Sequence, residues 1–143
     1  MAQEKQGLLT LAAVGDVRPN RDDPPSVFRY CIDVFHGADL VFGQLESPLS
    51  DRGTPMFVPQ SPGRRPLKTV SALNREGAGF DVMSFASNHC MHFGAEGLLD
   101  TISIARQNGI ALVGVGKNID DARKPAIIER KGTKIGFLAY NSI

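Results

Sequence analysis

The sequence predicts an α/β fold built on a parallel sheet, because strand-like and helix-like segments alternate along the chain. Two apolar runs, residues 8–14 and 38–42, each end in a glycine, which is typical of strands in a parallel sheet. Between them, apolar side chains recur at helical spacing from Val27 to Phe35. A strand, a helix and a second strand form a crossover unit, which is right-handed in nearly all proteins. The carboxyl ends of both strands therefore lie at one edge of the sheet.

Local signals delimit these first elements. The near-continuous apolar run of residues 8–14 indicates a strand that is buried on both faces. Asp23 and Pro24 open the helix, since proline is favoured at a first helical position, where no amide hydrogen is needed. Gly37 ends the helix, and His36 just before it is explained by the negative end of the helix dipole.

A long loop interrupts the alternation after the second strand. Residues 47–66 include five prolines and show no sustained hydrophobic period. In a compact domain, a loop of this length is usually functional or mobile. Arg64, Arg65 and Lys68 form a basic cluster beside it, which could meet an anionic substrate or simply be a solvated surface.

The remaining elements continue the alternation. They are a short helix over residues 67–77, a strand over 80–85, a helix that ends at Asn108 and Gly109, a strand over 110–115, and a hairpin of residues 126–130 and 134–140. The length of 143 residues is usual for one compact unit, so we expect a single domain over residues 1–143.

Composition and charge exclude several classes of protein. Apolar residues make up 42% and charged residues 22% of the chain, which excludes disordered and collagen-like chains. The formal net charge is +1 and basic residues do not interleave with aromatic ones, so we expect no nucleic-acid partner. Two cysteines, Cys31 and Cys90, are too few for a disulfide framework, and we expect reduced thiols.

No segment of the given sequence predicts export or membrane insertion. Residues 1–6 lead directly into the first strand, without the stretch of about 7–15 apolar residues that a signal peptide requires. No apolar run approaches the roughly 20 residues of a membrane span. As given, the chain is expected to be cytoplasmic, unless an export signal or anchor has been removed from it.

Polar side chains follow three of the predicted strands. Asp16 follows the first strand, Glu46 the second, and Asn88 and His89 the third. In open α/β sheets, ligands bind beyond the carboxyl ends of the strands. Taken singly, Asp16 and Asn88 could be turn or cap residues and His89 could be a core histidine. Their shared position instead favours one common site.

The residue types at these strand ends suit a divalent metal. Carboxylate, amide and imidazole groups form a mixed ligand set that suits Mn, Fe or Zn and suits Ca poorly. We therefore expect metal ligands among the four residues at the strand ends, which are Asp16, Glu46, Asn88 and His89.

His92 stands three residues after His89 and is a second candidate for chemistry. The two histidines could form a ligand pair on one helical face, but no glutamate stands where the His-Glu-x-x-His pattern of zinc proteases requires it. Cys90 between them could act as a nucleophile only with a lowered pKa, so a small buried side chain is the simpler expectation.

Five segments resemble the bacterial capsule-synthesis proteins of the CapA type. They are GDV at 15–17, ADLVFGQLESPL at 38–49, SFASNH at 84–89, GAEGLLDT at 94–101 and GVGKN at 114–118. This family is associated with poly-gamma-glutamate capsule formation and is similar in fold to the calcineurin-like metallophosphoesterases. The segments cover nearly the whole chain, so the resemblance is strong for the family and weaker for the reaction.

The resemblance implies a metallophosphoesterase-like α/β/β/α sandwich with a metal centre. It carries ligand roles onto the same four residues, Asp16, Glu46, Asn88 and His89. Members of the family continue well past Asn141 and supply further histidines from a second half. The chain is therefore expected to be the N-terminal part of a larger domain, with its site completed by a missing C-terminal half or by a partner chain. Four ligands suffice for one ion, whereas a two-metal site normally needs more.

Two residues depart from the family pattern. Gln44 stands where the family usually has asparagine, and it carries the amide on a side chain longer by one methylene. His92 stands where the family usually has aspartate, so a possible donor or ligand replaces an acceptor. Both changes make the surroundings of the ligands differ from the family pattern.

The leading hypothesis is a metal-dependent hydrolase in which metal-activated water attacks a phosphoester or amide of an anionic small-molecule or polymer substrate. His89 or His92 could protonate the leaving group. The alternative is a non-catalytic binding or assembly component of polymer synthesis or export, with a degenerate metal site, which Gln44 and His92 favour. Metal content distinguishes the two hypotheses.

Overall fold

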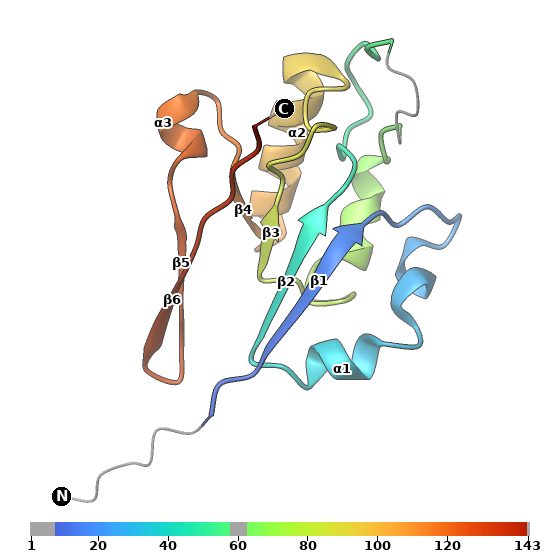
Figure 1. Cartoon of the computed structure of the whole chain (residues 1–143). Coiled ribbons are helices and arrows are strands. Elements are labelled where there is room, and N and C mark those ends of the chain that lie inside the picture. Colours follow the sequence, from blue (N-terminus) through green and yellow to red (C-terminus); the bar gives the residue numbers. More distant parts are fainter. Residues whose placement is uncertain (1–7, 58–62, 143) are drawn as a thin grey trace, which may run out of the picture.

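A four-stranded parallel sheet forms the centre of the structure, a computed structural model that describes residues 8–57 and 63–142 (Figure 1). The strand order is β1-β2-β3-β4, so each strand lies beside its predecessor and all carboxyl ends meet at one rim. The strands are β1 (Leu11–Val17), β2 (Leu40–Leu45), β3 (Val82–Ser84) and β4 (Ala111–Val113). The predicted α/β fold with a parallel sheet is confirmed.

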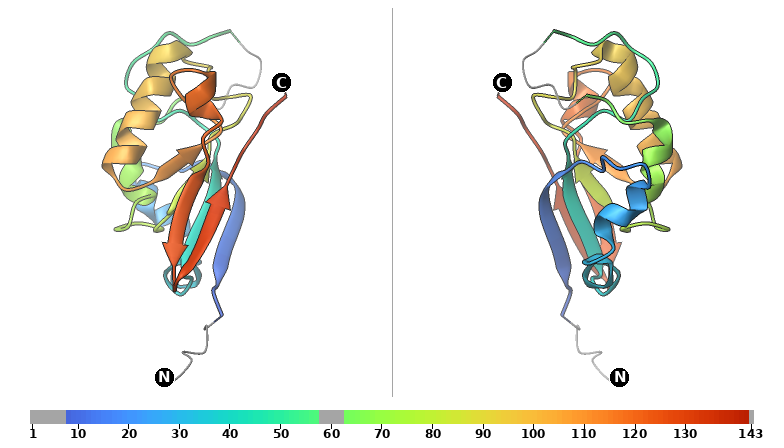
Figure 2. Two further views of the ribbon diagram at one scale, coloured as in Figure 1. Left: turned by 90° about the vertical axis from the view of Figure 1, so that its left-hand side faces the viewer. Right: turned by 90° about the vertical axis from the view of Figure 1, so that its right-hand side faces the viewer.

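Helical segments cover one face of this sheet, as the right-hand view of Figure 2 shows. They are the 3-10 helices η1 (Pro24–Phe28) and η2 (Leu67–Ala72) and the α-helices α1 (Ile32–His36) and α2 (Gly94–Gln107). The helix predicted between the first two strands is therefore two short pieces. Its residues include two prolines and several β-branched residues, which have low helix propensity.

Three phenylalanines form the centre of the core on this helical face. Phe28, Phe35 and Phe80 contact one another with ring centroids 5.7–5.8 Å apart. Phe80 also lies against β2 at Gly43, where an added Cβ would stand 2.7 Å from Cε1 of Phe80 and 3.1 Å from Cγ2 of Val17. Gly43 therefore allows the aromatic cluster to pack directly on the strand that leads to the candidate site.

A hairpin lies on the opposite face of the sheet, as both views of Figure 2 show. It consists of β5 (Ala126–Arg130) and β6 (Thr133–Phe137), which pair antiparallel as predicted. Phe137 of the hairpin stacks on Phe42 of β2, with ring centroids 5.5 Å apart and planes at 10°. The short helix α3 (Ile119–Ala122) precedes the hairpin.

The prediction that the first strand is buried on both faces is wrong. Leu11 is 47% exposed and Ala13 is also exposed. The physical reason is that β1 stands at the end of the strand order, while the stacking contact from the hairpin falls on β2. The strand also extends further than predicted, because after a bulge Asp16 pairs with Gln44 and Val17 pairs with Leu45.

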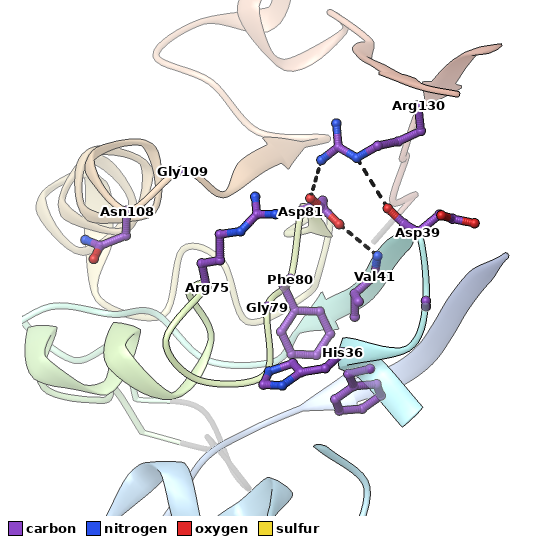
Figure 3. A pocket seen from close by; sticks show the side chains of 12 residues that line it. His36, Asp39, Val41, Arg75, Gly79, Phe80, Asp81, Asn108, Gly109 and Arg130 are labelled. Atoms are coloured by element: carbon purple, nitrogen blue, oxygen red, sulfur yellow. Dashed lines mark hydrogen bonds and ion pairs between the residues drawn. The ribbon is translucent and has the colours of Figure 1, made fainter. Parts of the chain in front are cut away.

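An aspartate at the amino-terminal ends of the strands fastens the hairpin to the sheet (Figure 3). Oδ1 of Asp81 accepts from Nη2 of Arg130 at 2.7 Å, and its Oδ2 accepts from the amide of Val41 at 2.9 Å. Nε of Arg130 also donates to the carbonyl of Asp39 at 3.3 Å. These groups line a cavity of about 340 Å³, at the end of the sheet opposite the predicted site.

Some expectations from the sequence fall outside what the structure covers. Residues 58–62 of the long loop and the N-terminal residues 1–7 lie outside the described residues. Among the residues that are described, no helix combines the length and the apolar character that crossing a bilayer requires.

Candidate metal centre

The register of the sheet places the side chains of Asp16 and Gln44, at the ends of β1 and β2, on one face. Asp16 pairs with Gln44, and Gln44 pairs with Ser84, so their side chains project from the same side of the sheet. Glu46 follows Gln44 by two residues and shares this side, since alternate residues of an extended chain face the same way. Its amide donates to the carbonyl of Val17 at 3.1 Å, which continues the pairing of β1 and β2 up to the rim.

Glu46 and His89 form the central contact of the site. Oε1 of Glu46 lies 3.0 Å from Nε2 of His89, and the two side chains are only 18% and 16% exposed. The other carboxylate oxygen of Glu46 accepts from the side-chain amide of Gln44 at 3.4 Å. The end of β2 and the segment after β3 therefore meet through these two side chains.

His92 extends this contact into the protein. Its Nδ1 lies 3.2 Å from Nδ1 of His89, and the two rings meet edge to face with centroids 4.6 Å apart. His92 is buried, and burial lowers its pKa, with a smaller contribution from the neighbouring His89. Because a carboxylate only accepts hydrogen bonds, Nε2 of His89 carries a proton when it bonds Glu46. In neutral His89 the Nδ1 atom then accepts, so the donor of the second bond is His92.

A series of tight turns holds the two histidines in place. The amide of His89 donates to Oγ of Ser87 at 3.0 Å, and the amide of His92 donates to the carbonyl of His89 at 3.1 Å. The carbonyl of His92 accepts from the amide of Met56 at 2.8 Å, which ties the turn to the long loop. His89 and His92 therefore belong to a turn that precedes α2. They do not form the ligand pair on one helical face that was considered from the sequence.

Asp16 and Asn88 take no part in this contact. Both are exposed, and within the described residues no hydrogen bond joins either of them to Glu46 or His89. Within the described part of the chain, the side chain of Asn88 makes a single hydrogen bond, in which its Oδ1 accepts from Oγ of Ser87 at 3.5 Å. The ligand roles of these two residues stay predictions.

Glu46 and His89 carry donor atoms of the types that bind divalent metals. Ligand oxygen and nitrogen atoms lie about 2.0–2.2 Å from Zn²⁺ in a tetrahedral site, so two neighbouring ligand atoms are about 3.4 Å apart. Oε1 of Glu46 and Nε2 of His89 lie closer than this, at the hydrogen-bond distance of 3.0 Å, so the two side chains would have to separate to hold an ion between them. Ser47, the next residue in the chain after Glu46, is 1% exposed, and its Oγ has no hydrogen-bond partner in the part of the chain that the structure describes.

The side chains as they stand do not form a complete metal shell. Within residues 8–57 and 63–142, no three His, Cys, Asp or Glu side chains are grouped so that they could hold an ion. Glu46 and His89 supply two donors, so further ligands have to come from the amide of Asn88, from a rotated Asp16, or from outside the described residues.

The other candidates of the sequence have structural explanations. Cys90 is partly buried against the core, and burial raises the pKa of its thiol, which does not favour a nucleophile. His36 lies at the far end of the sheet, where Nε2 bonds the carbonyl of Gly77 at 2.8 Å. The contact of Gln44 with Glu46 was not predicted, although the two-residue spacing on a strand is a signal that could have indicated it.

The sequence is similar to those of a known protein family. Residues 10–143 match the family model described as "Bacterial capsule synthesis protein PGA_cap". The chain is 24% identical to the PGA biosynthesis protein CapA of Bacillus subtilis over 95% of its own length, and 28% identical to the capsule biosynthesis protein CapA of Bacillus anthracis over 92%. An uncharacterised protein of Sinorhizobium fredii is 27% identical over 91% of the chain.

The match covers only part of each relative. The chain spans 38% of the Bacillus subtilis protein, 34% of the Bacillus anthracis protein and 30% of the Sinorhizobium fredii protein. The family model nevertheless extends over almost the entire chain, including every strand of the parallel sheet and the Glu46–His89 contact. The chain belongs to the family of bacterial capsule synthesis proteins.

Proposed function

We propose that this chain carries part of the metal site of a hydrolase that acts in capsule synthesis. The observation that carries the proposal is the contact between Glu46 and His89, in which a carboxylate and an imidazole lie 3.0 Å apart at the carboxyl-end rim of a parallel sheet. Rims of this kind are the usual ligand sites of α/β proteins. Membership of a capsule synthesis family connects the proposed chemistry with an anionic small molecule or polymer as substrate.

Glu46 and His89 would hold one ion, together with Asp16 and Asn88. Mn, Fe or Zn bound there would supply Lewis-acid polarisation of the substrate and a water acidic enough to act as a nucleophile near neutral pH. Gln44 holds the second oxygen of the Glu46 carboxylate, and this contact limits the rotation of that ligand. A second ion would require ligands from the part of the relatives that this chain does not span.

His89 cannot use the same nitrogen as a ligand and as a proton donor. If Nε2 of His89 binds the ion, the proton for the leaving group has to come from His92. If Nε2 keeps its proton, His89 is the general acid and His92 orients its ring through the contact between their Nδ1 atoms. Substitution of His89 distinguishes the two roles. If His89 is a ligand, its loss weakens metal binding, whereas if it is the general acid, its loss lowers the rate of hydrolysis and leaves metal binding unchanged.

Metal binding by the 143-residue chain tests the proposal. Isothermal titration with Mn²⁺, Fe²⁺ and Zn²⁺ should give saturable binding that Glu46→Gln and His89→Ala weaken by more than about 10-fold. His36→Ala is the matched control, since His36 lies at the opposite end of the sheet. Binding that is equal in all three variants would exclude this site.

The alternative function is a non-catalytic component of polymer synthesis or export. The incomplete group of ligands within the described residues and the replacement residues Gln44 and His92 favour it. Elemental analysis of a purified full-length relative decides between the two. Near-stoichiometric Mn, Fe or Zn supports the hydrolase, whereas persistent absence of metal after supplementation supports the binding component.

A further inference from the structure

A groove of about 920 Å³ lies between helix α2, strand β4 and the segment that begins with α3. β4 is the last strand in the order β1-β2-β3-β4, so the groove lies at one edge of the parallel sheet. Pockets that bind small molecules usually measure about 300–1,000 Å³. The groove is therefore large enough for such a ligand.

One face of α2 forms a wall of the groove. Its lining side chains recur at the three- and four-residue spacing of a single helical face, at Leu99, Ile102, Ser103 and Arg106. A different face of α2 packs on the protein core, because the buried residues of this helix are Gly97, Thr101 and Ala105. Leu99 is 46% exposed, so α2 presents apolar surface to the groove as well as to the core.

The side of the groove next to the sheet is aliphatic. Ile110, Leu112 and Val115 line it there. None of the described residues that line the groove is aromatic, so no ring is present on which a nucleotide base could stack. Burial of a hydrocarbon chain requires no particular geometry, since the hydrophobic effect is non-directional. The lining therefore suits an aliphatic ligand better than a flat ring.

Four charged side chains line the same groove, and they are Arg106, Lys117, Asp121 and Lys124. Nζ of Lys124 lies 2.7 Å from Oδ1 of Asp121. The pKa of Asp121 is lowered, first by this hydrogen bond, and the positive charges of Lys117 and Arg106 contribute to the lowering. One carboxylate thus faces three cations, which leaves two positive charges of the groove uncompensated.

These two charges are available to a ligand. Within the described residues, neither Arg106 nor Lys117 forms an ion pair. The start of α3 does not provide an alternative anion site, because the amide of Asp121 already donates to Oδ1 of Asn118 at 2.8 Å. An anion in the groove would therefore be held by the basic side chains.

We propose that this groove binds an aliphatic anion, a molecule in which a carboxylate or a phosphate is attached to a hydrocarbon chain. The chain would pack between the apolar face of α2 and Leu112 of β4, and the anionic group would bind Arg106 and Lys117. Guanidinium and ammonium groups bind both of these anions. The inference goes beyond the proposed function, because the groove shares no residue with the Glu46–His89 contact and its ligand requires no metal.

Calorimetric titration of the metal-stripped chain with decanoate, and separately with decyl phosphate, tests the groove. Both probes are used below the concentrations at which they form micelles, and low ionic strength limits screening. At least one of them should bind saturably at one site. Tighter binding of decanoate assigns a carboxylate ligand, and tighter binding of decyl phosphate assigns a phosphate ligand.

Two further compounds separate the contributions of the chain and of the charge. Decyltrimethylammonium has the same hydrocarbon chain with a positive charge, and inorganic phosphate has the anion without the chain. Each should bind at least about 10-fold more weakly than the better probe, because each lacks one of the two interactions. Equal binding of decyltrimethylammonium would overturn the proposal, since it would show that only apolar surface is recognised.

Variants locate the binding in the groove. Arg106→Gln and Lys117→Gln should each weaken binding of the better probe by about 10-fold, the loss expected for a hydrogen bond to a charged group. Both side chains are exposed, so their replacement leaves the core intact. Leu99→Asn should also weaken binding, because it places a polar group on the apolar wall.

Lys134→Gln is the matched control, since Lys134 is an exposed lysine of β6 that does not line the groove. It should bind the probes as the unaltered chain does. The proposal fails if neither decanoate nor decyl phosphate binds, as expected of a groove that is filled by a protein segment. It also fails if Lys117→Gln binds as tightly as Lys134→Gln.

Discussion

Oε1 of Glu46 lies 3.0 Å from Nε2 of His89, although the two residues belong to different strand ends of the sheet. If this pair binds a metal, Glu46→Gln should lower Zn²⁺ affinity more than Gln44→Ala does. The first change removes a ligand, whereas the second removes only the hydrogen bond that orients it, an effect of about 10-fold. Calorimetric titration of both variants checks the order, and a larger loss in Gln44→Ala would contradict it.

His92 should act on the site through His89. His92→Ala removes the side chain that contacts Nδ1 of His89 and leaves a small cavity, so the free energy of unfolding should fall by about 1–3 kcal/mol. Urea denaturation measures this loss.

His92→Asn supplies the control, because an amide can still bond Nδ1 of His89. It should bind Zn²⁺ more tightly than His92→Ala does. Equal affinities in the two variants would argue against any orienting role of His92.

The hairpin should depend on Asp81, which bonds both Arg130 and the amide of Val41 (Figure 3). Asp81→Ala should reduce the free energy of unfolding by about 1–3 kcal/mol, because it leaves the partly buried donors of β2 and β5 without their acceptor. A double-mutant cycle with Arg130→Ala isolates the ion pair. A coupling energy near zero would show that the two side chains act independently.

Gly43 should not tolerate a side chain. An alanine Cβ there would stand 2.7 Å from the ring of Phe80, so Gly43→Ala should destabilise the protein by about 1–3 kcal/mol through overpacking. Gly15→Ala is the matched control on the neighbouring strand, since a Cβ added at Gly15 would have no atom within 4 Å. Thermal unfolding of the two variants should differ, with only Gly43→Ala melting at a lower temperature.

Asp39 should make the stability of the fold sensitive to acid. Its pKa is lowered from 3.8 to about 2, first by the hydrogen bond from the amide of Thr10 and then by that from Lys131. A carboxyl whose pKa is lower in the folded state stabilises above its unfolded pKa, and this stabilisation is lost as the pH falls from about 4 to about 2. Denaturation at pH 2, 3, 4 and 6 should show a shallower decline in Asp39→Asn than in the unaltered chain.

The sequence was sufficient for the order of the strands and for the strand-end positions of the candidate residues. Hydrophobic periodicity distinguishes strands from helices, and glycine marks where a strand such as β2 bends toward the rim. From these signals the parallel sheet, the terminal hairpin and the strand-end positions of Glu46 and His89 could be predicted. These features follow from local sequence patterns and from the general right-handedness of crossover connections, so a single sequence is enough to predict them.

The tertiary structure alone decided which side chains touch. The exposure of Leu11, the contact of Glu46 with His89 and the stacking of Phe137 on Phe42 all involve the packing of separate segments. Periodicity describes how buried a position is, but it does not say which distant segment covers it. Among the four residues at the strand ends, the sequence therefore indicated a common face, and the fold brought only Glu46 and His89 into direct contact.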